Sequence, residues 1–86
     1  MTTMIGENTL TLDELSPGQR ATISRVEADG PLGQRLLSLG LLAGTEVELL
    51  RRALGGDPIE VQLMGYSLSL RRNEAQRIQV RLAKSS

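Results

Sequence analysis

Short stretches in which apolar and polar residues alternate recur along this chain, separated by turns that contain Gly or Pro. Alternation with a period of two is typical of strands with one buried face. It occurs over residues 9–12, 20–27, 46–53, 59–63, 66–70 and 78–82. The segment Ser16-Pro17-Gly18-Gln19 fits a type II turn, and residues 54–58 fit a hairpin loop. The pattern therefore predicts five or six short antiparallel strands.

One segment has helical periodicity instead. Leu32, Leu36 and Leu39 lie at positions i, i+4 and i+7, after Pro31, which suits a first helical turn. Gly40 suits the residue just past a helix end. We expect a helix of about two and a half turns here. Single helical turns are expected at residues 13–15 and 73–76.

This order of elements predicts a mainly β fold, a small SH3-like antiparallel β-barrel with one short inserted α-helix. The 86 residues allow one domain, which we place at residues 9–82, with flexible ends at 1–8 and 83–86. Leu70 and Val61 lie on the apolar faces of their strands and are predicted core residues.

The composition excludes several kinds of chemistry. The chain has no His and no Cys, which removes the usual general base, thiolate nucleophiles and the usual zinc ligands. We therefore expect no catalytic residues, no enzyme activity and no bound cofactor. We interpret Glu46, Glu48, Asp57 and Glu60 as solvated surface acids. The alternative is that they form a weak metal site with oxygen ligands.

The charges sum to zero but are unevenly placed. Residues 1–48 carry seven acidic and three basic residues, and residues 49–86 carry three acidic and seven basic residues. The doublets Arg51-Arg52 and Arg71-Arg72 are interpreted as solvated strand ends that pair with acids. In the hairpin around residues 54–58, Ala53 opposite Ile59 would place Arg52 opposite Glu60, a favourable cross-strand pair. Since Tyr66 is the only aromatic residue, we do not expect nucleic acid binding.

The leucine-rich segment 32–42 holds more leucines than a short helix needs to cover one side of a barrel. Two interpretations are open: all of them are core, or the surplus forms an apolar surface for a partner. The partner surface would comprise Arg35, Leu37, Leu41 and Leu42. A lower-ranked alternative is an SH3-type peptide groove beside Tyr66 and the Gly55-Gly56 loop.

The ordered motifs of the chain resemble those of the bacterial ferrous iron transport protein A (FeoA) family, over about residues 10–80. The residues that carry this resemblance are Arg35, Leu36, Leu39, Gly40 and Gly44, then the hairpin Gly56-Asp57-Pro58, then Gly65, Leu68, Ser69, Leu70, Arg71, Glu74 and Ala75.

The resemblance implies a small accessory protein of ferrous iron uptake that contacts the membrane permease FeoB, which has a cytosolic GTP-binding domain. Ferrous iron would then be the cargo of that partner. The alternative that the resemblance implies is a transition-metal-binding or metal-responsive SH3-like domain. The N-terminal residues lack a basic segment followed by an apolar run, and no apolar run approaches membrane-spanning length. We expect a cytoplasmic protein with no membrane insertion; its oligomeric state is not indicated.

Overall fold

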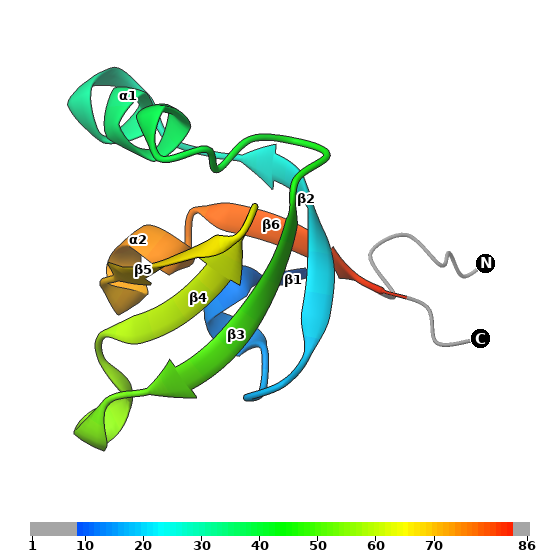
Figure 1. The fold of residues 1–86 in the computed structure, drawn as a ribbon. Coiled ribbons are helices and arrows are strands. Elements are labelled where there is room, and N and C mark those ends of the chain that lie inside the picture. Colours follow the sequence, from blue (N-terminus) through cyan, green and yellow to red (C-terminus); the bar gives the residue numbers. More distant parts are fainter. Residues whose placement is uncertain (1–8, 84–86) are drawn as a thin grey trace, which may run out of the picture.

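The computed structural model describes residues 9–83, which form a single six-stranded antiparallel sheet bent into a small barrel (Figure 1). The strand order is β1-β6-β2-β3-β4-β5. The strands are β1 (Thr9–Thr11), β2 (Arg20–Val26), β3 (Glu46–Arg52), β4 (Ile59–Leu63), β5 (Tyr66–Leu70) and β6 (Ile78–Leu82).

The helical segments lie in the connections between strands. Helix α1 (Gly30–Ser38) is inserted between β2 and β3, and the single turn α2 (Arg72–Ala75) precedes β6. Two short 3-10 turns are η1 (Leu12–Glu14) and η2 (Leu54–Gly56). The predicted mainly β SH3-like fold with one short inserted helix is confirmed, and each predicted strand and helical turn is present within a few residues of its expected place.

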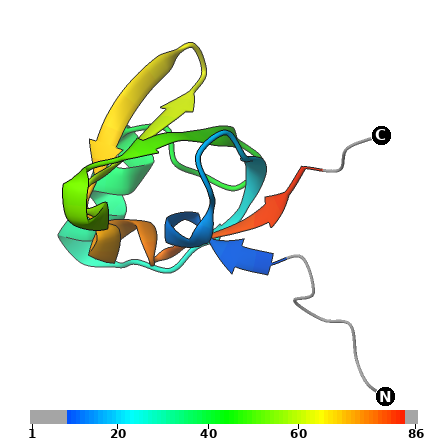
Figure 2. The same ribbon diagram turned by 90° about the horizontal axis from the view of Figure 1, so that it is seen from below.

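The last strand completes the sheet by lying between the first two. Val80 of β6 is opposite Leu10 of β1 on one side and opposite Ile23 of β2 on the other. Viewed from below, β6 crosses on the side of the barrel away from the β4–β5 hairpin (Figure 2). The first and last strands of the domain therefore pair with each other.

The core is made of aliphatic side chains from all six strands or their flanks. Leu70 and Val61 are 1% and 0% exposed, so both predicted core positions are confirmed. The alternation of each strand explains this, because residues on one face of a bent sheet all point into the barrel. The other buried apolar residues are Leu12, Leu15, Ala21, Ile23, Leu36, Leu41, Val47, Leu49, Ile59, Leu63, Ala75, Ile78 and Val80.

The register of the β3–β4 hairpin differs from the simple expectation that Arg52 faces Glu60. A register shift between Leu49 and Arg51 places Arg51 opposite Glu60 and Arg52 opposite Ile59. Arg51 then pairs with Glu60 at 3.0 Å. The irregularity is typical of a β-bulge, which turns the next side chain to a new direction.

Arg52, redirected in this way, helps to close one end of the barrel. Its guanidinium pairs with the carboxylate of Asp13 at 3.4 Å and donates to the Leu15 carbonyl oxygen at 2.8 Å and to the Asp13 carbonyl oxygen. Arg72 also pairs with Asp13, at 3.3 Å, and its backbone N–H donates to the Asp57 carboxylate at 3.0 Å. Asp13, which is 9% exposed, thus joins η1 to β3 and α2.

These contacts confirm the interpretation of the basic doublets for three of their four arginines. Each of Arg51, Arg52 and Arg72 pairs with an acid, and Asp13 comes from the acidic half of the chain. The predicted flexible ends fall almost wholly outside the described residues. Only Ala83 is described, and its N–H donates to the carbonyl oxygen of Arg20 at 3.0 Å.

Candidate functional site

Helix α1 ends in a motif that decides where its leucines point. The N–H of Gly40 donates to the Leu37 carbonyl oxygen at 2.9 Å, and the N–H of Leu41 donates to the Leu36 carbonyl oxygen at 3.1 Å. With Gly40 at φ +92°, this is the pattern of a Schellman C-cap. That motif commonly brings the second residue after the cap against the last turn of the helix.

The prediction that Leu41 is exposed for a partner is wrong. Leu41 is 1% exposed and belongs to the core together with Leu36, as the C-cap motif explains. The burial of Leu41 could have been predicted from the sequence, because Gly40 indicates this C-cap motif and the motif turns the next residue toward the helix. Leu37 and Leu42 are 56% and 42% exposed, so the leucine surplus is divided between the core and the surface.

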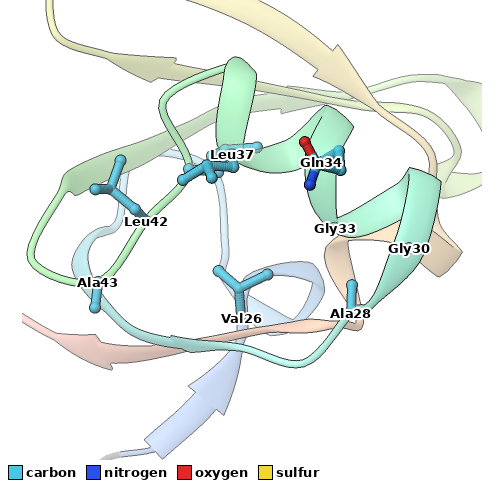
Figure 3. A pocket seen from close by; sticks show the side chains of 9 residues that line it. Val26, Ala28, Gly30, Gly33, Gln34, Leu37, Leu42 and Ala43 are labelled. Carbon is cyan, nitrogen blue, oxygen red and sulfur yellow. The ribbon is translucent and has the colours of Figure 1, made fainter.

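A groove lined by uncharged residues lies between α1 and the segments on either side of it (Figure 3). It has a volume of about 330 Å³, and its lining includes Leu37 of α1 and Leu42 of the connection to β3. None of its lining residues is charged. They are Val26, Ala28, Gly30, Gly33, Gln34, Leu37, Leu41, Leu42 and Ala43.

Most of this lining was not predicted from the sequence. Val26 continues the alternation of β2, but nothing in the local pattern of Ala28, Gln34 or Ala43 marks them, because they meet only when the helix folds back on β2. The connection is held there by β2, since Ile23 exchanges backbone hydrogen bonds with Thr45 and Gly44, each at 2.8 Å.

Two glycines allow close packing near the start of α1 and at its end. A Cβ on Gly33 would come within 2.5 Å of the Ala28 carbonyl oxygen, so only glycine fits at that approach. A Cβ on Gly40 would come within 2.9 Å of the Tyr66 hydroxyl. That hydroxyl donates to the Leu39 carbonyl oxygen and so joins the end of α1 to β5.

Arg35 connects α1 to the second helical turn. Its guanidinium is half exposed and pairs with the Glu74 carboxylate at 2.6 Å. Glu74 is itself fixed, because its other oxygen accepts the N–H of Arg71 at 3.0 Å. Arg35 thus lies outside the groove but on the same helix as Leu37.

The alternative peptide groove beside Tyr66 and the Gly55-Gly56 loop would have to run along the whole length of β4. Tyr66 is opposite Leu63 at the end of β4, whereas Gly55 and Gly56 precede its beginning. The two parts of the suggested groove therefore lie at opposite ends of the same strand.

The four acids suggested as a metal cluster are not brought together. Within residues 9–83, no group of three or more His, Cys, Asp or Glu side chains is placed to hold a metal ion. Asp57 accepts the N–H of Arg72, and Glu60 pairs with Arg51. Glu46 and Glu48 remain on the outer part of β3, where Glu48 is opposite Gln62 of β4.

Comparison with known families gives a match to the FeoA domain over residues 10–82, nearly all of the described chain. The chain belongs to the FeoA domain family. This family is implicated in ferrous iron transport. No helix of this FeoA domain within residues 9–83 is long and apolar enough to cross a membrane.

Solved structures of FeoA proteins superpose on this domain. The FeoA protein of Chlorobium tepidum is 42% identical, with a TM-score of 0.82, over 90% of this chain and 73% of that one. The FeoA of Stenotrophomonas maltophilia, solved in complex with zinc and described as a prokaryotic SH3 domain protein, is 33% identical. Its TM-score is 0.74, over 83% of this chain and 88% of that one.

A third relative is much longer. A fusion of Fe(2+) transport protein A with the Fe(2+) transporter FeoB, from Porphyromonas gingivalis, is 37% identical over 75 residues. The match covers 87% of this FeoA domain but 9% of the fusion protein.

Proposed function

We propose that this FeoA domain is a cytosolic accessory protein of ferrous iron uptake, which acts by contact with the cytosolic GTP-binding part of a FeoB-type permease. The observation that carries the proposal is the Porphyromonas gingivalis relative, in which a FeoA-like segment and FeoB form one chain. Joining two modules covalently raises their effective concentration, which favours pairs that function in contact. Iron is then the cargo of the permease, and this domain needs no cofactor of its own.

The exposed side of α1 and its exit is the surface that best fits such a contact. Leu37 and Leu42 are large apolar side chains that are half exposed at the rim of an uncharged groove. Apolar anchors that fill pockets at the centre of an interface supply most of its binding energy. Arg35, outside the groove, would lie at the polar edge of the interface, where charged groups mainly orient the partner.

The experiment is a calorimetric titration with the purified cytosolic domain of the permease from the same organism. The double variant Leu37→Asp/Leu42→Asp is expected to bind at least about tenfold more weakly than the parent, because two anchors are replaced by charges. Leu41 is left unchanged, since a charge at that buried position would disrupt the fold.

The control is the single variant Leu54→Asp. Leu54 is 100% exposed and lies in η2, between β3 and β4, so this variant should bind as the parent does. Circular dichroism checks that both variants are folded. Parental affinity in the folded Leu37→Asp/Leu42→Asp variant would show that this surface is not the docking site.

A second candidate function is transition-metal binding, which the zinc complex of the Stenotrophomonas maltophilia relative favours. In this chain the donor set is restricted, since it has neither His nor Cys. Carboxylates and carbonyls are hard oxygen ligands that discriminate poorly between ferrous iron and Mg²⁺ or Ca²⁺. We therefore rank this function below the accessory role.

A further inference from the structure

Strand β5 is an edge of the sheet, with one side that has no partner strand among the described residues. The strand order ends at β5, and within residues 9–83 only β4 pairs with it. Figure 2 shows β5, in yellow, on the outer side of the β4–β5 hairpin. Ser67 and Ser69 of this strand are exposed. This side of β5 is therefore accessible to another strand.

The hairpin turn determines which backbone groups of β5 face the open side. Leu63 is opposite Tyr66 across a two-residue turn whose residues both have positive φ, the arrangement of a type I′ hairpin. The pair that closes such a turn exchanges hydrogen bonds, and bonded and non-bonded pairs then alternate along the ladder. The N–H and carbonyl groups of Ser67 and Ser69 therefore point away from β4.

Strand β5 lacks the features by which proteins usually protect an exposed edge. Residues 66–70 contain no charge and no Pro, and their register with β4 is continuous, without a bulge. Charges, Pro and bulges are the common means of preventing edge-to-edge pairing. The other edge strand, β1, has only three residues, which itself limits pairing. Of the two edges, β5 is the one suited to accept a strand.

A second copy of β5, running antiparallel, matches the backbone groups of this edge. If Leu68 of one copy lies opposite Leu68 of the other, each Ser67 lies opposite a Ser69. Every outward N–H and carbonyl group of the two serines then has a partner, which gives four hydrogen bonds. A register shifted by two residues would leave one of the serines opposite a residue outside β5. One register is therefore favoured.

The side chains agree with this register. Leu68 meets its own copy, and Tyr66, which is 43% exposed, comes opposite Leu70 of the second copy, so apolar residues share one face. The serines share the other face, where cross-strand hydroxyl pairs can form hydrogen bonds. Arg71 comes opposite Gly65 of the second copy, so the two arginines lie at opposite ends of the ladder and do not repel each other.

We infer that two copies of this domain pair through β5 and form a symmetric dimer with one continuous sheet. The contact is isologous, since the same residues meet on both sides, and it closes at two copies. A ladder of one short strand is a small interface, so the dimer is weak and forms at high protein concentration. No residue of β5 lines the groove beside α1, so this contact is separate from the proposed permease surface.

Amide hydrogen exchange tests the contact at single residues. In dilute protein Ser67 and Ser69 should exchange rapidly, whereas Leu68 and Leu70 are protected by their bonds to β4. Raising the concentration to about 1 mM should slow exchange at both serines by at least about twofold, because the dimer protects them. Leu68 is the internal control, since its N–H already has a partner in the single copy. Exchange at the serines that does not depend on concentration would overturn the inference.

Two double variants at the exposed serines test the register. Ser67→Glu/Ser69→Lys places opposite charges across both serine pairs of the dimer, whereas Ser67→Lys/Ser69→Lys places like charges there. The variants differ only at residue 67, and in both the lysine at position 69 is opposite Glu60 of β4. In sedimentation equilibrium at about 1 mM, the first should dimerise several-fold more tightly than the parent and the second should remain monomeric. Circular dichroism checks that both are folded.

Two outcomes of sedimentation would contradict the inference: a parent that stays monomeric at that concentration, and equal association of the two double variants. A monomeric parent together with weaker permease binding by Ser67→Lys/Ser69→Lys would show instead that the edge accepts a strand of the permease. The proposed function is judged separately. Leu37→Asp/Leu42→Asp should still dimerise as the parent does, and Ser67→Lys/Ser69→Lys should still bind the permease.

Discussion

Leu70 is the last residue of β5 and is 1% exposed inside a core that has only aliphatic side chains among the described residues. It is surrounded by other branched side chains, so the space left by a truncated side chain cannot be filled by a flexible neighbour. Leu70→Ala should lower the free energy of unfolding by roughly 2–5 kcal/mol. Urea denaturation measures this change.

Leu54→Ala is the matched control for Leu70→Ala, since the same side chain is removed at a position that is 100% exposed. Its effect should stay within about 0.5 kcal/mol of the parent. Equal effects of the two substitutions would contradict the assignment of Leu70 to the core.

Asp13 offers a second comparison at the scale of single residues. Its carboxylate is nearly buried and pairs with both Arg52 and Arg72, whereas the pair of Arg51 with Glu60 is largely exposed. Asp13→Ala should cost about 1–3 kcal/mol of stability, because partly buried guanidinium groups lose their acceptor. Glu60→Ala should cost less than about 1 kcal/mol. Urea denaturation of the two variants measures both changes. A larger loss of unfolding free energy for Glu60→Ala than for Asp13→Ala would contradict this account.

At the scale of elements, the position of α1 on the barrel depends on Gly40. Gly40 and Gly18 both have a left-handed backbone, at φ +92° and +91°. Only at Gly40 would an added Cβ collide with a neighbouring group, the Tyr66 hydroxyl. Both Gly→Ala variants pay the left-handed penalty of about 1–2 kcal/mol. Gly40→Ala should lower the free energy of unfolding more than Gly18→Ala does, and it should raise the rate of amide hydrogen exchange in α1.

Gly18→Ala serves as the control, since a Cβ there meets nothing within 4 Å. Equal melting temperatures for the two variants, with equal hydrogen exchange in α1, would show that contact with Tyr66 does not hold the helix.

The elements that could be predicted from the sequence are those with local causes. Alternation predicted the strands, and Pro31 and Gly40 predicted the limits of α1. The β3–β4 register was mispredicted because an even pairing was carried past Leu49-Leu50, where the alternation breaks and the register shifts. The pairing of Asp13 with Arg72 was unpredictable for another reason: it depends on how the whole sheet closes, which brings together residues far apart in the sequence.

At the scale of the whole molecule, the distribution of carboxylates determines whether a metal ion can bind tightly. Its carboxylates are distributed over the surface or engaged by arginines, and within residues 9–83 they form no group of three. Anaerobic calorimetric titration of the metal-free protein with ferrous iron should therefore give no site with a Kd below about 1 μM. Mg²⁺ at equal concentration is the control. A stoichiometric sub-micromolar ferrous site that Mg²⁺ does not fill would contradict this prediction.

The position of β6 between β1 and β2 sets the order in which the protein can acquire its structure during synthesis. The β3–β4–β5 meander consists of neighbours in sequence and can form as soon as it is made. Strands β1 and β2, although synthesised first, have no ladder to each other until β6 exists, because each pairs with it. Strand β2 can pair with β3 earlier, but β1 and the other edge of β2 have no partner strand until residues 78–82 have been made, so the barrel closes only when the last strand of this domain is available.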